Sequence, residues 1–228
     1  MSDPVANAPA APRLAATIVL LRDSDRGPEV WLQERSRAVG FMPSAWVFPG
    51  GRVDPGDEDG LSSPDERVPR AFWTAAVREL AEEANIQLPL DALRPYARWI
   101  TPTAEPRRFD TLFFVARAPE GAAPRVDGQE AVAGGWFGVG DAVDRIEAGT
   151  LPTAPPTLRT LWELRDEPDV AAILAPERRL VPCCPAYHID PDGTHFVLLP
   201  GDPDHPSPDA VDPPHRYAFL QGRWWARG

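Results

Sequence analysis

The sequence predicts an α/β (α+β) protein, because stretches typical of strands and of helices alternate along one chain. Residues 15–22 form a continuous apolar run with β-branched side chains, which is typical of a buried strand. Residues 29–33 follow a turn at 23–27, so we expect the two runs to form a hairpin. A helix is expected from Pro69 or Arg70 to about Asn85, since proline suits the first turn of a helix.

The rest of the chain continues this mixture. We expect strands at 97–101, at 111–116 and at the end of 129–137, helices at 139–148 and 157–166, and a connector at 90–96. Residues 180–189 and 195–199 are expected to pair around the turn 190–193. The predicted organisation is a disordered tail at 1–12, one main domain at 13–166 and a proline-rich extension at 167–228 packed on its core.

Composition narrows the class of protein. The chain has 228 residues, 43% hydrophobic and 25% charged, which is ordinary for a soluble globular protein. The net charge of −11 argues against a nucleic-acid surface, and all basic residues are arginine, which excludes lysine chemistry. The two cysteines, Cys183 and Cys184, are adjacent and allow no disulfide framework, so a reducing cytoplasm is expected. Neither a signal peptide nor a membrane-spanning run is predicted.

The predicted helix contains an acidic cluster. Glu79, Glu82 and Glu83 stand at spacings i, i+3 and i+4, which places them within an arc of about 100° on a helix. Trp73 and Leu80 fall on nearly the opposite side and can be buried. Like charges at this spacing repel each other, so the cluster either faces bulk water or holds cations. Carboxylate oxygens are the ligands that Mg²⁺ prefers.

A glycine-rich loop precedes this helix, in the stretch Trp-Val-Phe-Pro-Gly-Gly-Arg-Val-Asp-Pro-Gly-Asp at 46–57. Loop and helix together resemble the signature of the Nudix hydrolases: Gly, five residues, Glu, seven residues, then Arg-Glu-U-x-Glu-Glu-x-Gly-U, where U is bulky and apolar. Gly51 takes the first glycine, Asp57 stands for the first Glu, and Asn85 replaces the later Gly. Residues 58–77 replace the seven-residue spacer, so thirteen residues, 58–70, are inserted as an expected surface loop.

The resemblance implies a fold and a set of roles. The fold is a Nudix-type α/β/α sandwich with a mixed central sheet and, here, a C-terminal extension. The cofactor is Mg²⁺ (or Mn²⁺), held by Gly51, Glu79, Glu82 and Glu83. The general base is one of these glutamates or Glu130, for which a plain surface glutamate is the alternative. Arg78 is expected to tie the helix to the loop through Asp57, and Gly50 and Gly51 let the backbone turn sharply.

Three arginines are candidates for substrate binding. Arg35, within Arg-Ser before the loop, and the pair Arg107 and Arg108, within Arg-Arg-Phe-Asp-Thr-x-Phe-Phe, resemble motifs of coenzyme A diphosphatase-like Nudix enzymes with a long insertion. Arginine is suited to clamp a phosphate or stack on a base. The alternatives are an ion pair of Arg35 with an acidic neighbour and a solvated strand end at 107–108.

The expected function is metal-dependent hydrolysis of the diphosphate bond of a nucleoside diphosphate linked to another moiety, with coenzyme A or acyl-CoA as the favoured substrate. ADP-ribose or another nucleotide is the alternative substrate, and a non-catalytic nucleotide sensor is the alternative class. The partner expected is such a small molecule, with neither nucleic acid nor membrane; a homodimer is left open. A zinc site at Cys183, Cys184, His188 and His195 is not expected, because the spacing fits no standard pattern.

Overall fold

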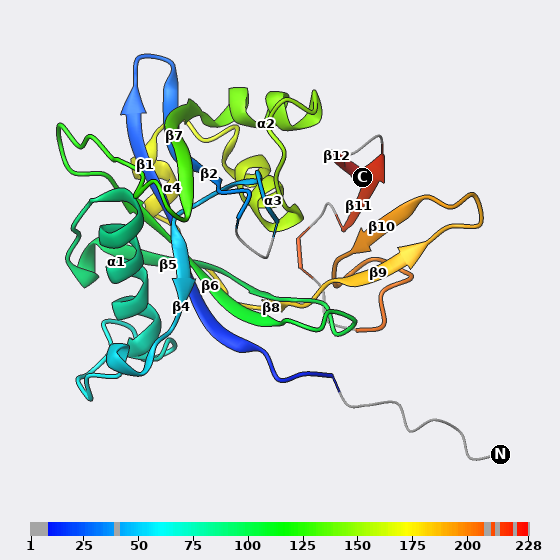
Figure 1. Cartoon of the computed structure of the whole chain (residues 1–228), viewed down its shortest axis with the longest axis horizontal. Coiled ribbons are helices and arrows are strands. Elements are labelled where there is room, and N and C mark those ends of the chain that lie inside the picture. Colours follow the sequence, from blue (N-terminus) through cyan, green and yellow to red (C-terminus); the bar gives the residue numbers. More distant parts are fainter. Residues whose placement is uncertain (1–8, 39–41, 208–210, 213–214, 221–222, 228) are drawn as a thin grey trace.

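A computed structural model describes residues 9–38, 42–207, 211–212, 215–220 and 223–227. Its centre is an eight-stranded mixed sheet in which β3-β2-β1-β6-β5-β8 are neighbours, while β4 pairs with β1 and β7 with β2 (Figure 1). The strands of this sheet are β1 (Arg13–Ser24), β2 (Gly27–Arg35), β3 (Trp46–Val47), β4 (Gly50–Arg52), β5 (Leu93–Ile100), β6 (Phe109–Arg117), β7 (Ala131–Gly138) and β8 (Pro182–Cys183). The pairs β1–β6 and β5–β8 are parallel and the others antiparallel, so the expected mixed α/β fold is confirmed.

Helices cover both faces of this sheet. On one face, α1 (Arg70–Ala84) packs Phe72, Trp73 and Leu80 against Ile18 and other apolar side chains of the strands. On the other face lies a second core that includes residues of α2 (Val139–Glu147), α3 (Pro155–Leu164) and α4 (Val170–Leu174). β1 feeds both cores because its side chains alternate between the two faces and almost all of its central residues are buried.

The ends of α1 follow from its sequence. Pro69 stands at the N-cap, where its missing N–H costs nothing because the first helical N–H groups lack intrahelical partners. Asn85 ends the helix in the left-handed conformation, with φ 55° and ψ 36°. The Asn85 N–H donates to Ala81 O, and Asn is one of the few non-glycine residues that adopt this conformation readily. The predicted helix is therefore confirmed at both ends.

The extension at 167–228 contributes a smaller four-stranded sheet in the order β12-β11-β10-β9. Its strands are β9 (Ala186–Ile189), β10 (His195–Leu198), β11 (Arg216–Leu220) and β12 (Arg223–Arg227). The predicted hairpin is confirmed as β9 and β10, which project away from α1 in Figure 1. Cys183, Val197 and Tyr217 belong to the same buried cluster as the apolar residues of α3.

Two expectations about local structure are wrong. Residues 90–96 are not a plain connector: a short 3-10 helix, η2 (Leu90–Ala92), leads into β5, which begins at Leu93. Pro95 hides this strand in the sequence, and the register shifts between Pro95 and Ala97 because proline cannot donate to the ladder. Residues 180–189 are not one strand either, since β8 joins the central sheet and β9 the smaller one. Of the predicted tail at 1–12, residues 1–8 lie outside the described residues, and 9–12 have no regular structure.

No helix among the described residues combines the length and apolar character needed to cross a membrane.

Candidate active site

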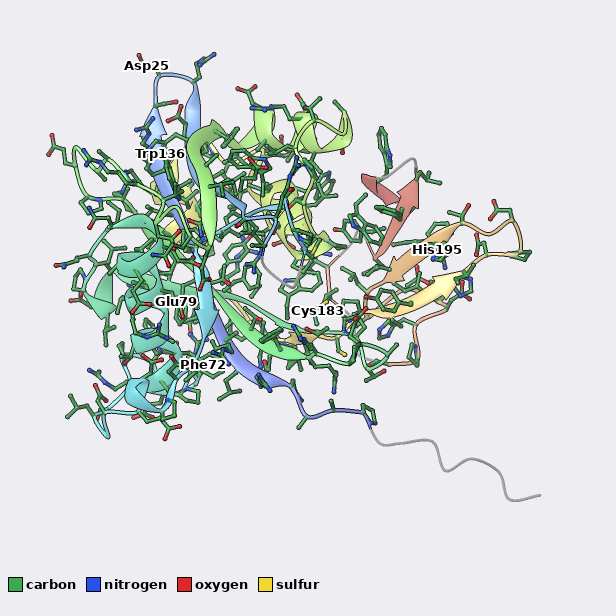
Figure 2. All side chains as sticks on the ribbon, in the orientation of Figure 1. Asp25, Phe72, Glu79, Trp136, Cys183 and His195 are labelled. Carbon is green, nitrogen blue, oxygen red and sulfur yellow. The ribbon has the colours of Figure 1, made fainter. Side chains whose placement is uncertain are left out.

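The acidic helix and the glycine loop lie against each other. In Figure 2, Glu79 lies between α1 and the sheet, beside β4. Gly50 and Gly51 of β4 pair with Thr17 and Ala16 of β1, which fixes the loop to the centre of the sheet. The loop also continues into a short 3-10 helix, η1 (Pro55–Asp57), which contacts α1 through Asp57.

Glu79 packs directly on Gly51. A Cβ atom at Gly51 would lie 2.4 Å from Glu79 Oε1 and 2.5 Å from its Cδ, so only glycine leaves room for the carboxylate. At Gly50, a Cβ atom would lie 2.4 Å from Ala16 O, so this position also excludes a side chain. The double glycine therefore brings backbone and carboxylate together.

Glu83 is the most deeply buried of the three glutamates, with 6% of its surface exposed. Its Oε2 accepts a hydrogen bond of 2.8 Å from Gly50 N and one of 2.7 Å from Gln33 Nε2. Burial raises the pKa of Glu83 to about 7, because these two hydrogen bonds compensate only in part and the charges of Glu79 and Glu130 add to the rise.

Glu79 and Glu82 share a partner, Arg78. Arg78 Nη1 donates to Glu79 Oε1 at 2.8 Å and to Glu82 Oε2 at 3.0 Å. Burial raises the pKa of Glu79, the bond from Arg78 opposes that rise, and the charges of Glu82 and Glu130 add to it. The Glu82 side chain is 59% exposed, so the three glutamates run from buried to open rather than forming one uniform acidic face.

Arg78 also holds the loop to the helix. Its Nε and Nη2 donate to both carboxylate oxygens of Asp57, at 3.1 and 3.0 Å, and Nη2 donates to Arg52 O at 2.9 Å. Asp57 is 2% exposed and accepts in addition from Asp54 N. The hydrogen bonds and charges of Asp57, and after it of Glu79, raise the pKa of Arg78 against the effect of burial, so Arg78 remains a cation. Arg78 and Asp57 thus join the helix to the loop through a two-point ion pair.

Glu130 lies within electrostatic reach of the site. It is exposed, and its charge raises the pKa of both Glu79 and Glu83. Asp127 fixes the loop before β7 by accepting hydrogen bonds from the N–H groups of Glu130 and Ala131. The chain thus places a further carboxylate within electrostatic reach of Glu79 and Glu83, and its role as a ligand or base stays a prediction.

The three candidate arginines differ in their surroundings. Arg35 pairs in register with Ala131 at the end of β2, which puts it beside the loop of Glu130. Arg108 binds backbone instead: its Nε donates to Thr101 O and its Nη1 to Ala10 O at 2.8 Å, so it secures the start of β1. Arg107 is exposed and makes no hydrogen bond or ion pair with another described residue. The structure therefore places Arg35 beside the loop of Glu130, whereas the Arg108 side chain is engaged with backbone carbonyls.

The donor set of the site is suited to a hard divalent cation. In the part of the chain that is described, no three His, Cys, Asp or Glu side chains converge closely enough to hold an ion as they stand, and Arg78 occupies both Glu79 and Glu82. The chemistry of the site nevertheless suits a hard cation: all donors are oxygen, and the buried Glu83 and the partly buried Glu79 have raised pKa values that a positive ion would lower. Glu82 is exposed, so it can turn without disturbing the core.

Gln33 is a site residue to which the sequence analysis assigned no role. Its side chain is 2% exposed and contacts Glu83 directly. The signal was present in the alternation of the strand, because Gln33 falls on the same face as Trp31, which packs in the core beneath α1. A glutamine at such an inward position requires a polar partner.

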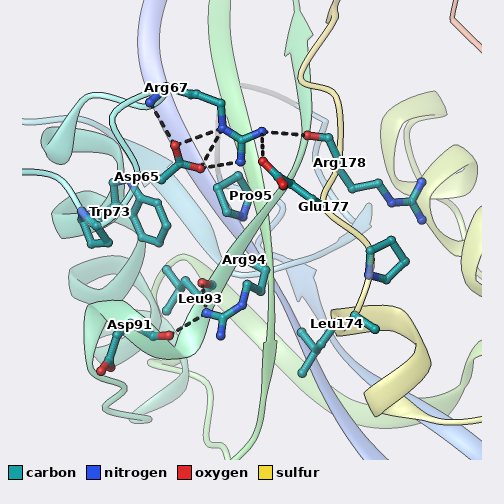
Figure 3. A pocket seen from close by; sticks show the side chains of 13 residues that line it. Asp65, Arg67, Trp73, Asp91, Leu93, Arg94, Pro95, Leu174, Glu177 and Arg178 are labelled. Carbon is teal, nitrogen blue, oxygen red and sulfur yellow. Dashed lines mark hydrogen bonds and ion pairs between the residues drawn. The ribbon is translucent and has the colours of Figure 1, made fainter.

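The insertion at 58–70 is an ordered loop away from the glutamates. Arg70 pairs with Asp59, and Val68 is buried in the core beneath α1. Arg67 binds Asp65 and Glu177 and donates to Arg178 O, which ties the insertion to the segment before β8 (Figure 3). Between these segments and the start of β5 lies a cavity of about 560 Å³, lined by Trp73 and Arg94 among others, and none of the candidate site residues lines it.

Comparison with known proteins identifies the family of this chain. A curated relative, "Putative nudix hydrolase 7" of Caenorhabditis elegans, is 25% identical over an alignment of 261 positions, which covers 91% of this chain and 85% of the relative. The crystal structure of a NUDIX hydrolase from Alicyclobacillus acidocaldarius superposes with a TM-score of 0.67 at 27% identity, covering 73% of this chain and 96% of that one. The model of the NUDIX domain matches residues 11–158. The chain therefore belongs to the NUDIX domain family and is a hydrolase of the Nudix type.

Proposed function

We propose that this hydrolase uses Mg²⁺ (or Mn²⁺) to cleave the diphosphate bond of a nucleoside diphosphate linked to another moiety, with coenzyme A or acyl-CoA as the favoured substrate. The observation that supports the proposal most is the contact between loop and helix. Gly51 leaves room for the carboxylate of Glu79, and Gly50 N donates to Glu83. One buried and one partly buried carboxylate of raised pKa, both held against the glycine backbone, are suited to binding a cation.

In this proposal the residues of the site have separate tasks. Glu79, Glu82, Glu83 and the Gly51 carbonyl would hold the ion. When bound, the ion supplies charge to neutralise the phosphate oxygens and to acidify a water. A carboxylate among Glu79, Glu82, Glu83 and Glu130 orients that water or takes its proton. Arg78 keeps helix and loop in register through Asp57 and does not act as a base, because its pKa is raised further.

The substrate's negative charge requires local cations, since the chain as a whole carries −11. Arg35 is the best placed of the arginines because it adjoins the loop of Glu130. Arg107 is exposed and suited to reach a phosphate, whereas Arg108 contributes by fixing the backbone beside it. The preference for coenzyme A rests on the motifs around Arg35 and at 107–114 and on the long insertion.

The residue test uses isosteric variants of the glutamates. Glu82→Gln and Glu83→Gln are expected to lower kcat for Mg²⁺-dependent hydrolysis by at least about 100-fold, because each removes a charge from the ion's shell or the base. Glu120→Gln, an exposed glutamate at a turn, serves as the matched control and is expected to leave kcat unchanged. Unchanged turnover in both site variants, with circular dichroism showing folded protein, would contradict the proposed mechanism.

A substrate panel tests the finer part of the proposal. Coenzyme A, acetyl-CoA, ADP-ribose and dinucleoside polyphosphates are incubated with the protein and Mg²⁺, and the products are identified by mass. Release of 3′,5′-ADP and phosphopantetheine supports the favoured substrate. Cleavage of ADP-ribose alone assigns the alternative substrate, and tight nucleotide binding without cleavage of any compound assigns the sensor.

A further inference from the structure

Gln33 contacts Glu83 of the candidate site, although it lies outside the sequence motif that contains the glutamates. It stands on β2 with its side chain on the face that α1 covers, and only 2% of its surface is exposed. Its Nε2 donates to Glu83 Oε2 at 2.7 Å. Glutamine is seldom buried to this degree without partners for both ends of its amide.

The other end of this amide has no partner. Gln33 Oε1 is fully buried and accepts no hydrogen bond from any residue that the structure describes. Exchanging the two ends of the amide does not remove the problem while Glu83 is ionised, because it would turn an oxygen toward a carboxylate oxygen. The donor end therefore faces Glu83, and an acceptor is left over beside the glutamates.

The same contact determines how Glu83 is presented. Its Oε2 receives two donors, Gly50 N at 2.8 Å and Gln33 Nε2 at 2.7 Å. Its Oε1 receives a hydrogen bond from no described residue. Two donors on one oxygen fix the plane of the carboxylate, and the second oxygen remains available to a ligand.

We propose that Gln33 is a positioning residue with two tasks. Its Nε2 holds Glu83 so that Oε1 of that carboxylate meets the cation, and its own Oε1 accepts a hydrogen bond from a water that enters with the cation. This inference rests on the proposed metal-dependent function and adds to it a residue outside the acidic cluster. Groups that orient metal ligands in this way affect metal affinity and activity about 10- to 100-fold.

A purely structural role predicts a different outcome for the same substitution. If Gln33 only filled space beneath α1, methionine would replace it well, because it has a similar length and no unpaired acceptor. If Gln33 positions Glu83, the Met variant folds normally and still binds the cation poorly. Metal affinity in the folded protein therefore separates the two roles.

The experiment measures Mn²⁺ binding by calorimetry in the full chain, together with kcat and KM for the best compound of the substrate panel. Gln33→Met is expected to weaken Mn²⁺ affinity about 10- to 100-fold and to lower kcat, with KM changed less than about threefold. Gln87→Met, at an exposed glutamine just beyond α1, is the matched control and is expected to match the wild type. Gln33→Asn keeps the amide on a shorter arm, is expected to lose affinity likewise, and serves if the Met variant unfolds.

The outcomes distinguish this inference from the proposed function. Wild-type Mn²⁺ affinity and kcat in folded Gln33→Met and Gln33→Asn overturn the role of Gln33 and leave the metal-dependent hydrolase standing. A wild-type protein that binds no Mn²⁺ and cleaves nothing overturns both. Weak Mn²⁺ binding in the Gln33 variants, with normal binding in Gln87→Met, supports the inference.

Discussion

At the scale of single residues, the candidate site contains a carboxylate, Glu83, in surroundings where burial disfavours its ionised form. Glu83 is held by two donors and is still raised in pKa to about 7, because lost solvation outweighs two hydrogen bonds. A carboxylate used only for stability would gain more at the surface. The cost is understandable if a cation removes it, since binding of metal and loss of the proton are linked.

This cost has a measurable consequence for stability without metal. The folded pKa of Glu83, about 7, lies above its ordinary value of 4.5, so between these pH values the folded state binds more protons than the unfolded state. The contribution of Glu83 to the free energy of unfolding therefore falls as pH rises from about 4.5 to 7, by an amount on the order of 3 kcal/mol. Urea unfolding in EDTA at pH 5 and pH 8 is expected to show this fall in the wild type and much less of it in Glu83→Gln. An identical pH dependence in Glu83→Gln and the wild type would show that the pKa of Glu83 is not raised in the folded protein.

Gly51 offers a second test at this scale. Gly51→Ala places a Cβ 2.4 Å from Glu79 Oε1, so the carboxylate must move, and we expect kcat to fall at least about tenfold. Gly56→Ala in the same loop meets nothing within 4 Å and is expected to keep full activity. Steady-state kinetics of both variants checks the pair, and equal activity would mean that the contact with Glu79 has no role in catalysis.

At the scale of elements, the motif was predictable and its setting was not. The spacing of Glu79, Glu82 and Glu83 gave a helix with one acidic side, and α1 has the predicted ends. The spacing could not reveal that exposure rises from Glu83 to Glu82, because this depends on β2 and β4 packing against one edge of the helix. Gln33 was missed for the same reason: its partner is 50 residues away along the chain.

The junction between η1 and α1 is the element-scale test. Asp57→Asn removes the buried charge that pairs with Arg78, whose side chain is 27% exposed. Breaking a fully buried ion pair costs about 3–5 kcal/mol. Because Arg78 is partly exposed, we expect Asp57→Asn to lower the free energy of unfolding by about 2 kcal/mol. Glu58→Gln, next in the chain and exposed, is expected to change the free energy of unfolding by less than about 0.5 kcal/mol. Chemical denaturation measures both, and equal stability would mean that the Arg78–Asp57 pair does not hold the loop.

At the scale of the whole molecule, the structure of the extension at 167–228 was the part least predictable from the sequence. Short strands such as β8, with two residues, carry no periodicity, and prolines mask the pattern around them. The structure nevertheless joins β8 to β5 and buries Leu199 and Tyr217 with the apolar side of α3. We infer that the predicted boundary at residue 166 separates two parts of one folding unit rather than two independent domains.

A matched pair of leucines tests that inference. Leu199 is completely buried in the core shared with α3, whereas Leu61 in the insertion is 64% exposed. Leu199→Ala is expected to lower the free energy of unfolding by about 2–5 kcal/mol, because it leaves a cavity in a close-packed core, and Leu61→Ala by less than about 0.5 kcal/mol. If the extension and the main domain form one unit, unfolding of Leu199→Ala remains a single transition, shifted as a whole when followed both by tryptophan fluorescence and by circular dichroism. An early transition limited to part of the signal, with the remainder unshifted, would instead mean that the extension unfolds alone and that the Nudix core is stable without it.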